Sequence, residues 1–134
     1  MTALRGSVRR EVRMAVPADE VWAWIGDAPR LAEWFPGIES ATVEGTIRTI
    51  VTGAGIAMPE EIVTNDAIQR RFQYRITAPM FREHLSTIDV LDLGDGTSLV
   101  VYGADAIPST MALVIAGAAG DALEHLRTIL EGTR

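Results

Sequence analysis

The chain has 134 residues, of which 48% are apolar, a formal net charge of −6 and no cysteine, and all twelve of its basic residues are arginine. These values fit one domain spanning residues 1–134 with a core of its own, and they argue against nucleic acid as the main partner. Without cysteine or lysine, the chain has no disulfide, thiol nucleophile, thiolate metal site or Schiff-base lysine.

The first predicted element is a strand in "SVRREVRMAV", residues 7–16. Its apolar residues share one parity, and charged residues take the other, which is typical of a half-buried strand. Arg10 falls on the apolar parity. It lies either near an end of the sheet or facing a polar cavity, and the first position is favoured. The N-terminal arginines flank no apolar segment, and no run of 18 apolar residues follows, so we expect neither a signal peptide nor a membrane span and place the protein in the cytoplasm.

Half of the eight aromatic residues lie in "VWAWIGDAPRLAEWFPGI", residues 21–38. Pro17 and Gly26 bound one short helix, and Asp27 and Pro36-Gly37 bound a second. The pair has the shape of a helix-turn-helix but lacks the basic face of a DNA reader. Trp22, Trp24, Trp34 and Phe35 either anchor a small core or belong to two helices that close a large cavity.

The rest of the chain predicts an antiparallel meander and one long helix. Glycine, proline and Asn-Asp turns separate six expected strands, at residues 39–44, 46–51, 60–66, 70–77, 82–93 and 97–106. A helix begins at Ser109 and ends at Gly132. Its middle, residues 116–120, contains only alanine and glycine, which permits either close packing on a sheet or an empty space.

This order of elements resembles the helix-grip fold of the START-like (SRPBCC) superfamily, which includes polyketide cyclase/dehydratase-like proteins. The segments that carry the resemblance are "VPADEVWAWIGDAPRLAEWFPGIESATVEG", "IRTIVTGAG", "PEEIVTND" and "REHLSTIDV". It implies an α+β fold in which a curved seven-stranded antiparallel sheet grips the C-terminal helix, and the two short helices after the first strand close one end. It also implies a mainly apolar cavity, and ligand cavities of this kind enclose roughly 300–1,000 Å³.

Three polar residues are the candidate catalytic groups: Arg48, Glu60 and His84. Arg48 is either an inward cation or a surface arginine, and of the adjacent Glu60 and Glu61 only one can face inward. The resemblance matches Arg48 and Glu60 to the cavity arginine and glutamate of abscisic-acid receptors and of the onion lachrymatory-factor synthase. It places His84 at a cavity tyrosine position, where a histidine either shuttles protons or is a hydrogen-bonded structural residue.

The predicted ligand-binding residues are Trp34, Phe35, Glu61, Tyr74, Arg82, Ser86, Tyr102, Ile115 and Ala119. Two histidines without cysteine give no metal site, and no phosphate or dinucleotide motif is present, so no cofactor is expected. The expected partner is a small hydrophobic molecule that is polyketide-like, aromatic or lipid-like, bound by a monomer or homodimer. The leading hypothesis is a cofactor-independent cyclase or dehydratase; a non-catalytic carrier or sensor and a protein-interaction module are the alternatives.

Overall fold

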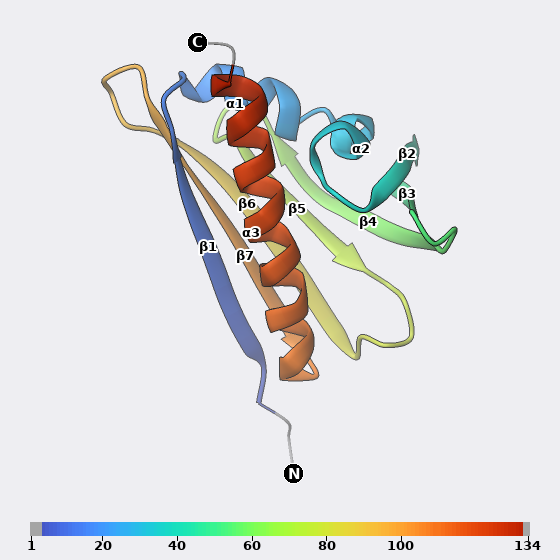
Figure 1. Cartoon of the computed structure of the whole chain (residues 1–134). Helices are drawn as coiled ribbons and strands as arrows, with labels where there is room; N and C mark the ends of the chain where they lie inside the picture. Colours follow the sequence, from blue (N-terminus) through green and yellow to red (C-terminus); the bar gives the residue numbers. More distant parts are fainter. Residues whose placement is uncertain (1–3, 133–134) are drawn as a thin grey trace.

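A seven-stranded antiparallel sheet curves around one long helix in the computed structural model, which describes residues 4–132 (Figure 1). The strand order is β1-β7-β6-β5-β4-β3-β2, so β1 and β2 are the two edges. The strands are β1 (Gly6–Met14), β2 (Ile38–Glu44), β3 (Ile47–Thr52), β4 (Ala57–Asp66), β5 (Arg71–Ile76), β6 (Glu83–Asp92) and β7 (Ser98–Ile107). The helices are α1 (Ala18–Ile25), the 3-10 turn η1 (Ala28–Arg30), α2 (Leu31–Trp34) and α3 (Ser109–Glu131). The predicted helix-grip fold is confirmed, and the second predicted short helix is η1 continued by α2.

Period-two alternation separates the two faces of the sheet. Along β6 and β7 every second side chain is buried, from His84 to Val90 and from Ser98 to Ala106. The last strand pairs with the first, and Val12 lies opposite Val100. This pairing brings the start of the chain beside α3, because α3 follows β7 directly and packs across β1 and β7 (Figure 1).

The small residues of α3 pack closely on this side of the sheet. Ala112, Ala116 and Ala119 are buried, and a Cβ built at Gly6 of β1 would lie 2.5 Å from the Ser109 carbonyl oxygen. The backbones of helix and strand therefore approach more closely than larger side chains would allow.

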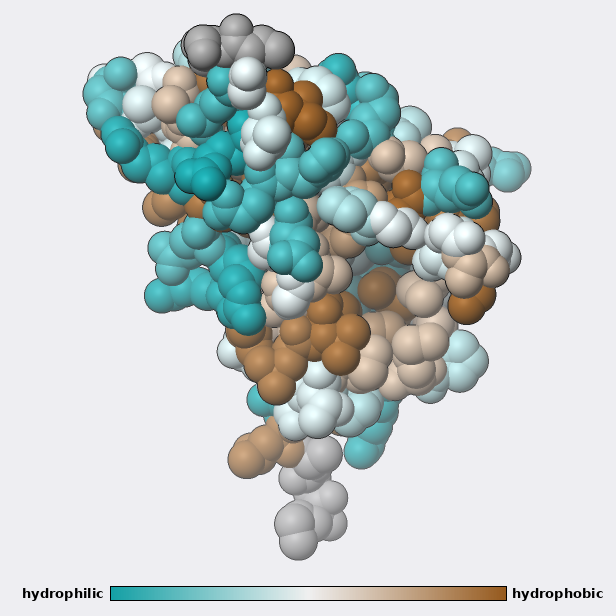
Figure 2. Space-filling view, viewed as in Figure 1, coloured by the Kyte–Doolittle hydropathy of each residue, from teal (hydrophilic) through white to brown (hydrophobic). Residues whose placement is uncertain are grey.

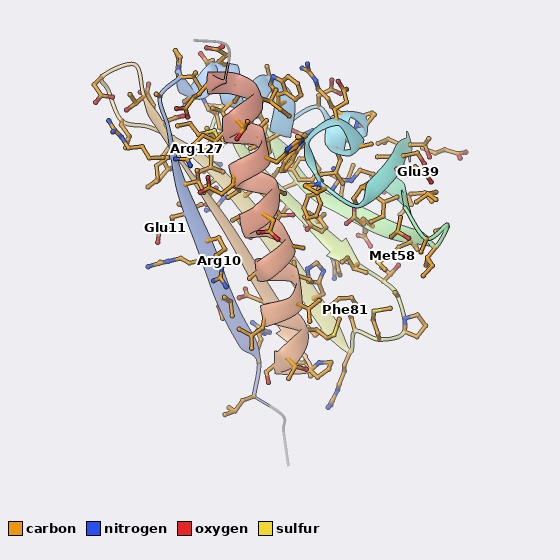
Figure 3. All side chains as sticks on the ribbon, in the orientation of Figure 1. Arg10, Glu11, Glu39, Met58, Phe81 and Arg127 are labelled. Carbon is orange, nitrogen blue, oxygen red and sulfur yellow. The ribbon has the colours of Figure 1, made fainter. Side chains whose placement is uncertain are left out.

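Arg10 lies in the middle of β1, opposite Tyr102, so its predicted place near a sheet end is wrong. The residue is exposed, and its side chain lies between β1 and α3 (Figure 3). A Cβ at Gly120 would be 3.4 Å from Arg10 Cγ. Because Gly120 has no side chain, the aliphatic stem of Arg10 covers the helix there while the guanidinium reaches solvent.

The short helical segments extend this core, with α1 against β6 and β7 and with η1 and α2 against β2. Val21 and Ile25 of α1 and Leu31 and Trp34 of α2 are buried, and all four join the main core. Within residues 4–132, no helix has the length and apolar character needed to cross a membrane.

Candidate functional site

A buried ion pair joins β3 to β4 on the inner face of the sheet. Arg48 lies directly opposite Glu60, and the two residues are 2% and 3% exposed. Arg48 Nε donates to Glu60 Oε1 at 2.8 Å, and Nη1 donates to the Ala28 carbonyl oxygen at 3.2 Å. The guanidinium carbon lies 5.0 Å from the ring centre of Phe72 and 5.3 Å from that of Tyr74. Arg48 is therefore the inward cation, and Glu60 is the inward member of the two adjacent glutamates.

Only one oxygen of the Glu60 carboxylate is held by this pair. No hydrogen-bond partner of Oε2 is found among residues 4–132. Burial raises the pKa of Glu60, and the charge and hydrogen bond of Arg48 oppose the rise without cancelling it. The carboxylate is thus a stronger base than a solvated glutamate, and its orientation is fixed by Arg48.

A second polar network begins at His84, where β5 and β6 separate. The last paired residues are Tyr74 and Ser86, and beyond them the Ile76 backbone N–H donates to His84 Nδ1 at 2.8 Å. Nδ1 is therefore unprotonated, so His84 Nε2 carries the proton and donates it to Ser86 Oγ at 2.7 Å. Burial lowers the pKa of His84 to about 4, and the imidazole is neutral at pH 7.

The network continues from Ser86 to two buried tyrosines. Ser86 lies directly opposite Tyr74 across β5 and β6, and the hydroxyls of Tyr74 and Tyr102 hydrogen-bond each other. Burial raises the pKa of Tyr74 to about 12 and also raises that of Tyr102. Both phenols are therefore protonated and serve as hydrogen-bonding groups at neutral pH.

A cavity of about 150 Å³ lies between α3 and the β3–β5 half of the sheet. Its lining is apolar except for Glu60 and Tyr74, and consists of Leu31, Phe35, Ile38, Ile50, Glu60, Tyr74, Ile76, Val114, Ile115 and Ala118. Val114 is also 60% exposed, so the cavity opens to solvent beside α3. Figure 2 shows apolar atoms gathered over the N-terminal half of that helix, next to a recess in the surface. The expected apolar cavity is present, but it is smaller than 300 Å³.

Four of the predicted site residues, Phe35, Glu60, Tyr74 and Ile115, line this cavity, while the other predicted residues lie elsewhere. Four others are buried in the ion pair and the network described above and do not line the cavity: Arg48, His84, Ser86 and Tyr102. Trp34 is 2% exposed, with its ring centre 5.8 Å from that of Phe35, and Ala119 is fully buried. Both are packing residues and not part of the lining.

Two predicted ligand-binding residues, Glu61 and Arg82, lie outside the interior, so their predicted inward position is wrong. Glu61 follows Glu60 on β4, so strand alternation turns it to the outer face, where its carboxylate lies 3.7 Å from Arg75. Arg82 precedes β6 and is exposed, and its backbone N–H bonds to the Ile107 carbonyl oxygen. The strand begins only at Glu83, so parity with His84 did not turn Arg82 inward.

Six lining residues were not among the predicted site residues: Leu31, Ile38, Ile50, Ile76, Val114 and Ala118. The sequence positions of three of these residues nevertheless indicate that they share a face with a predicted site residue. Ile50 has the parity of Arg48, Ile76 has the parity of Tyr74, and Ala118 lies one helical turn after Ile115. Among the described residues no group of three or more potential metal ligands occurs.

Comparison with known proteins identifies the family of this chain. The model of the family "Polyketide cyclase / dehydrase and lipid transport" matches residues 5–131. The chain belongs to this family. Curated proteins give no significant sequence match.

Solved structures share the fold at low sequence identity. XoxI from Bacillus cereus is 22% identical with a TM-score of 0.87, over 96% of this chain and 99% of that one. Truncated norcoclaurine synthase from Thalictrum flavum is 15% identical with a TM-score of 0.80, over 98% and 96% of the two chains. A START superfamily protein from Mycobacterium smegmatis is 17% identical with a TM-score of 0.69, over 95% of each chain. The family and the fold together indicate a hydrophobic ligand-binding protein.

Proposed function

We propose that this protein is a cofactor-independent enzyme that binds a small apolar carbonyl compound and catalyses a cyclisation or dehydration begun by proton abstraction. The observation that carries the proposal is the Glu60 carboxylate in the wall of an apolar cavity, with Oε1 held by Arg48 and Oε2 without a partner among the described residues. A fixed carboxylate with a raised pKa is suited to act as a general base near neutral pH.

In the proposed reaction, Glu60 takes a proton from the carbon next to the ligand carbonyl. The electron pair of that C–H bond moves to the carbonyl oxygen, and the hydroxyl of Tyr74 donates a hydrogen bond to the resulting enolate. In a cyclisation, the enolate carbon then forms a bond to a second carbonyl carbon, and Glu60 returns its proton to the second oxygen. No other reactant is needed, so the residues of this cavity suffice.

Arg48 and His84 act through these two groups and do not touch the ligand in this proposal. Arg48 holds the carboxylate of Glu60 through Nε, and its Nη1 donates to the Ala28 carbonyl oxygen. His84 donates to Ser86, which leaves the Ser86 hydroxyl proton available for Tyr74. Both of these predicted catalytic residues are therefore assigned as positioning residues.

Deuterium exchange at the carbon next to the carbonyl of acetophenone, followed by NMR in D₂O, tests the proton abstraction directly. We expect Glu60→Gln to reduce the exchange rate by about 100-fold or more, because general-base catalysis contributes this much, while acetophenone still binds. Glu61→Gln is the matched control, since Glu61 is on the outer face and its loss leaves exchange unchanged. Tyr74→Phe keeps the base and removes the enolate donor, so it slows exchange as well.

The family description also includes lipid transport, which favours a non-catalytic carrier as the second candidate. Binding of acetophenone by the unmodified protein, with exchange no faster than in buffer, would support the carrier and contradict the enzyme.

A further inference from the structure

We propose that the ligand is an uncharged carbonyl compound about the size of one aromatic ring, and that multi-ring compounds, long-chain lipids and carboxylates are excluded. This inference concerns the same cavity and rests on the proposed function for its location. It adds the size and charge class of the ligand.

The size limit follows from the cavity volume of about 150 Å³. An apolar protein cavity of about this volume holds one benzene molecule. The lining comes from α2, β2, β3, β4, β5 and α3 together with Phe35 at the end of α2, so strands and helices bound the cavity except at its mouth beside α3. A larger ligand would leave part of its apolar surface in water at this mouth. Enlarging such a wall forces packed elements apart, whereas a flexible loop would move at little cost.

The charge limit follows from the bonds that the ion pair already makes. Arg48 donates to Glu60 and to the Ala28 carbonyl oxygen and does not line the cavity. The Arg48–Glu60 pair is neutral as a unit, and the member that reaches the cavity is the carboxylate. A ligand carboxylate would therefore be desolvated among apolar side chains, close to a like charge and without a cation to pair with.

The polar groups of the lining lie together at one place on the sheet. Glu60 is opposite Ile76, and Tyr74 is two residues before Ile76 on the same face of β5. Glu60 and Tyr74 are thus diagonal neighbours on adjacent strands, and the rest of the lining is apolar. This arrangement fits a compound of single-ring size that directs its reacting carbonyl group at the sheet and its hydrocarbon part at α3.

Calorimetric titration of the whole protein with four probes tests the inference: acetophenone, 2-acetonaphthone, benzoate and laurate. Two aromatic rings offer more apolar area than one, so a cavity without a size limit would bind 2-acetonaphthone more tightly than acetophenone. We expect the reverse order, with acetophenone bound at least about tenfold more tightly than each of the other three.

Variants on the exposed side of α3 locate the binding without disturbing the core. Ala118 is exposed and lines the cavity mouth, so Ala118→Phe is expected to weaken acetophenone binding by about tenfold or more. Thr110→Phe is the matched control, because Thr110 is exposed on the same helix and does not line the cavity.

The outcomes separate this inference from the proposed function. If 2-acetonaphthone or laurate binds as tightly as acetophenone and Ala118→Phe weakens it, the size limit is wrong and the cavity remains a ligand site. If benzoate binds as tightly, the charge limit is wrong. If acetophenone binding is unchanged in Ala118→Phe, or if none of the probes binds, the proposed ligand site is wrong as well.

Discussion

The two halves of the inner sheet face differ in how they meet the helices. On the β1–β7 half, small residues of α3 and Gly6 bring the backbones into close contact and leave no room for a ligand. On the β3–β5 half, the sheet carries a buried ion pair, Tyr74 and a cavity. Both halves belong to one continuous sheet. The difference in packing between them therefore arises from their side chains and not from the strand topology.

The long helix takes part in both halves through different faces. Ala112, Ala116 and Ala119 are buried, whereas Val114, Ile115 and Ala118 line the cavity. Close packing on one side fixes α3, and the fixed helix then holds one wall of the cavity. The packing of α3 on the β1–β7 half thus holds the helix wall of the cavity on the β3–β5 half in place. Substitutions in the two halves are expected to have different consequences.

The largest effect is expected from breaking the ion pair. Arg48→Ala leaves the Glu60 carboxylate buried without its partner, and removal of one member of such a pair costs about 3–5 kcal/mol of unfolding free energy. Urea unfolding at pH 7 measures it. The double variant Arg48→Met with Glu60→Leu removes both charges and is expected to recover most of the loss. A loss below about 1 kcal/mol in the single variant would contradict a buried pair at this position.

The close packing of α3 on β1 is expected to make stability sensitive to a single added methyl group. In Gly6→Ala the new Cβ would meet the backbone of Ser109 at 2.5 Å, and such overpacking costs about 1–3 kcal/mol. Gly103→Ala on neighbouring β7 is the control, because its nearest atom would be 3.9 Å away. Equal unfolding free energies for the two variants would mean that α3 does not pack on β1 this closely.

The pH dependence of stability tests the His84 network. The native pKa of about 4 lies below the ordinary value of 6.5, so the unfolded chain binds a proton first as the pH falls. The stabilisation is therefore complete above pH 6.5 and declines between pH 6.5 and 4, by at most about 1.4 kcal/mol per pH unit.

A variant without a titrating group isolates this contribution. His84→Gln keeps one acceptor for the Ile76 N–H and one donor for Ser86, so its stability relative to the parent protein should rise as the pH falls from 7 to 4. The raised pKa of Glu60 acts in the opposite direction but is common to both proteins and cancels in the difference. Parallel stability curves for the two proteins would contradict a buried neutral imidazole.

The smallest effect is expected on the solvent side of α3. Gly117 is exposed within the helix, and a Cβ there would have no atom within 4 Å. Gly117→Ala should therefore raise the unfolding free energy by about 0.5–1 kcal/mol, because alanine loses less backbone entropy in a helix. A lower thermal midpoint for this variant would contradict the open space beside Gly117.

The sequence by itself determined the order of elements, because proline, glycine and alternating parity act within a few residues. The strands, the two short helical segments after Pro17 and the long helix after Pro108 all appeared near their predicted bounds. Parity also restricted the inward candidates to one of Glu60 and Glu61 and placed Arg48 with Ile50.

Tertiary structure alone decided which inner-face residues reach the cavity. Arg48, Ser86 and Tyr102 share the inner face with Glu60 and Tyr74, yet of these five only Glu60 and Tyr74 line the cavity. Arg48 donates to the Ala28 carbonyl oxygen, and Ser86 and Tyr102 lie on β6 and β7, beside the half of the sheet that holds the cavity. The alanine and glycine segment of α3 likewise permitted either close packing or an empty space. In the folded protein one face of α3 packs on the sheet, and the neighbouring face of the same helix lines the cavity. Local sequence fixes the face on which a side chain lies, whereas its accessibility depends on partners that are distant in the chain.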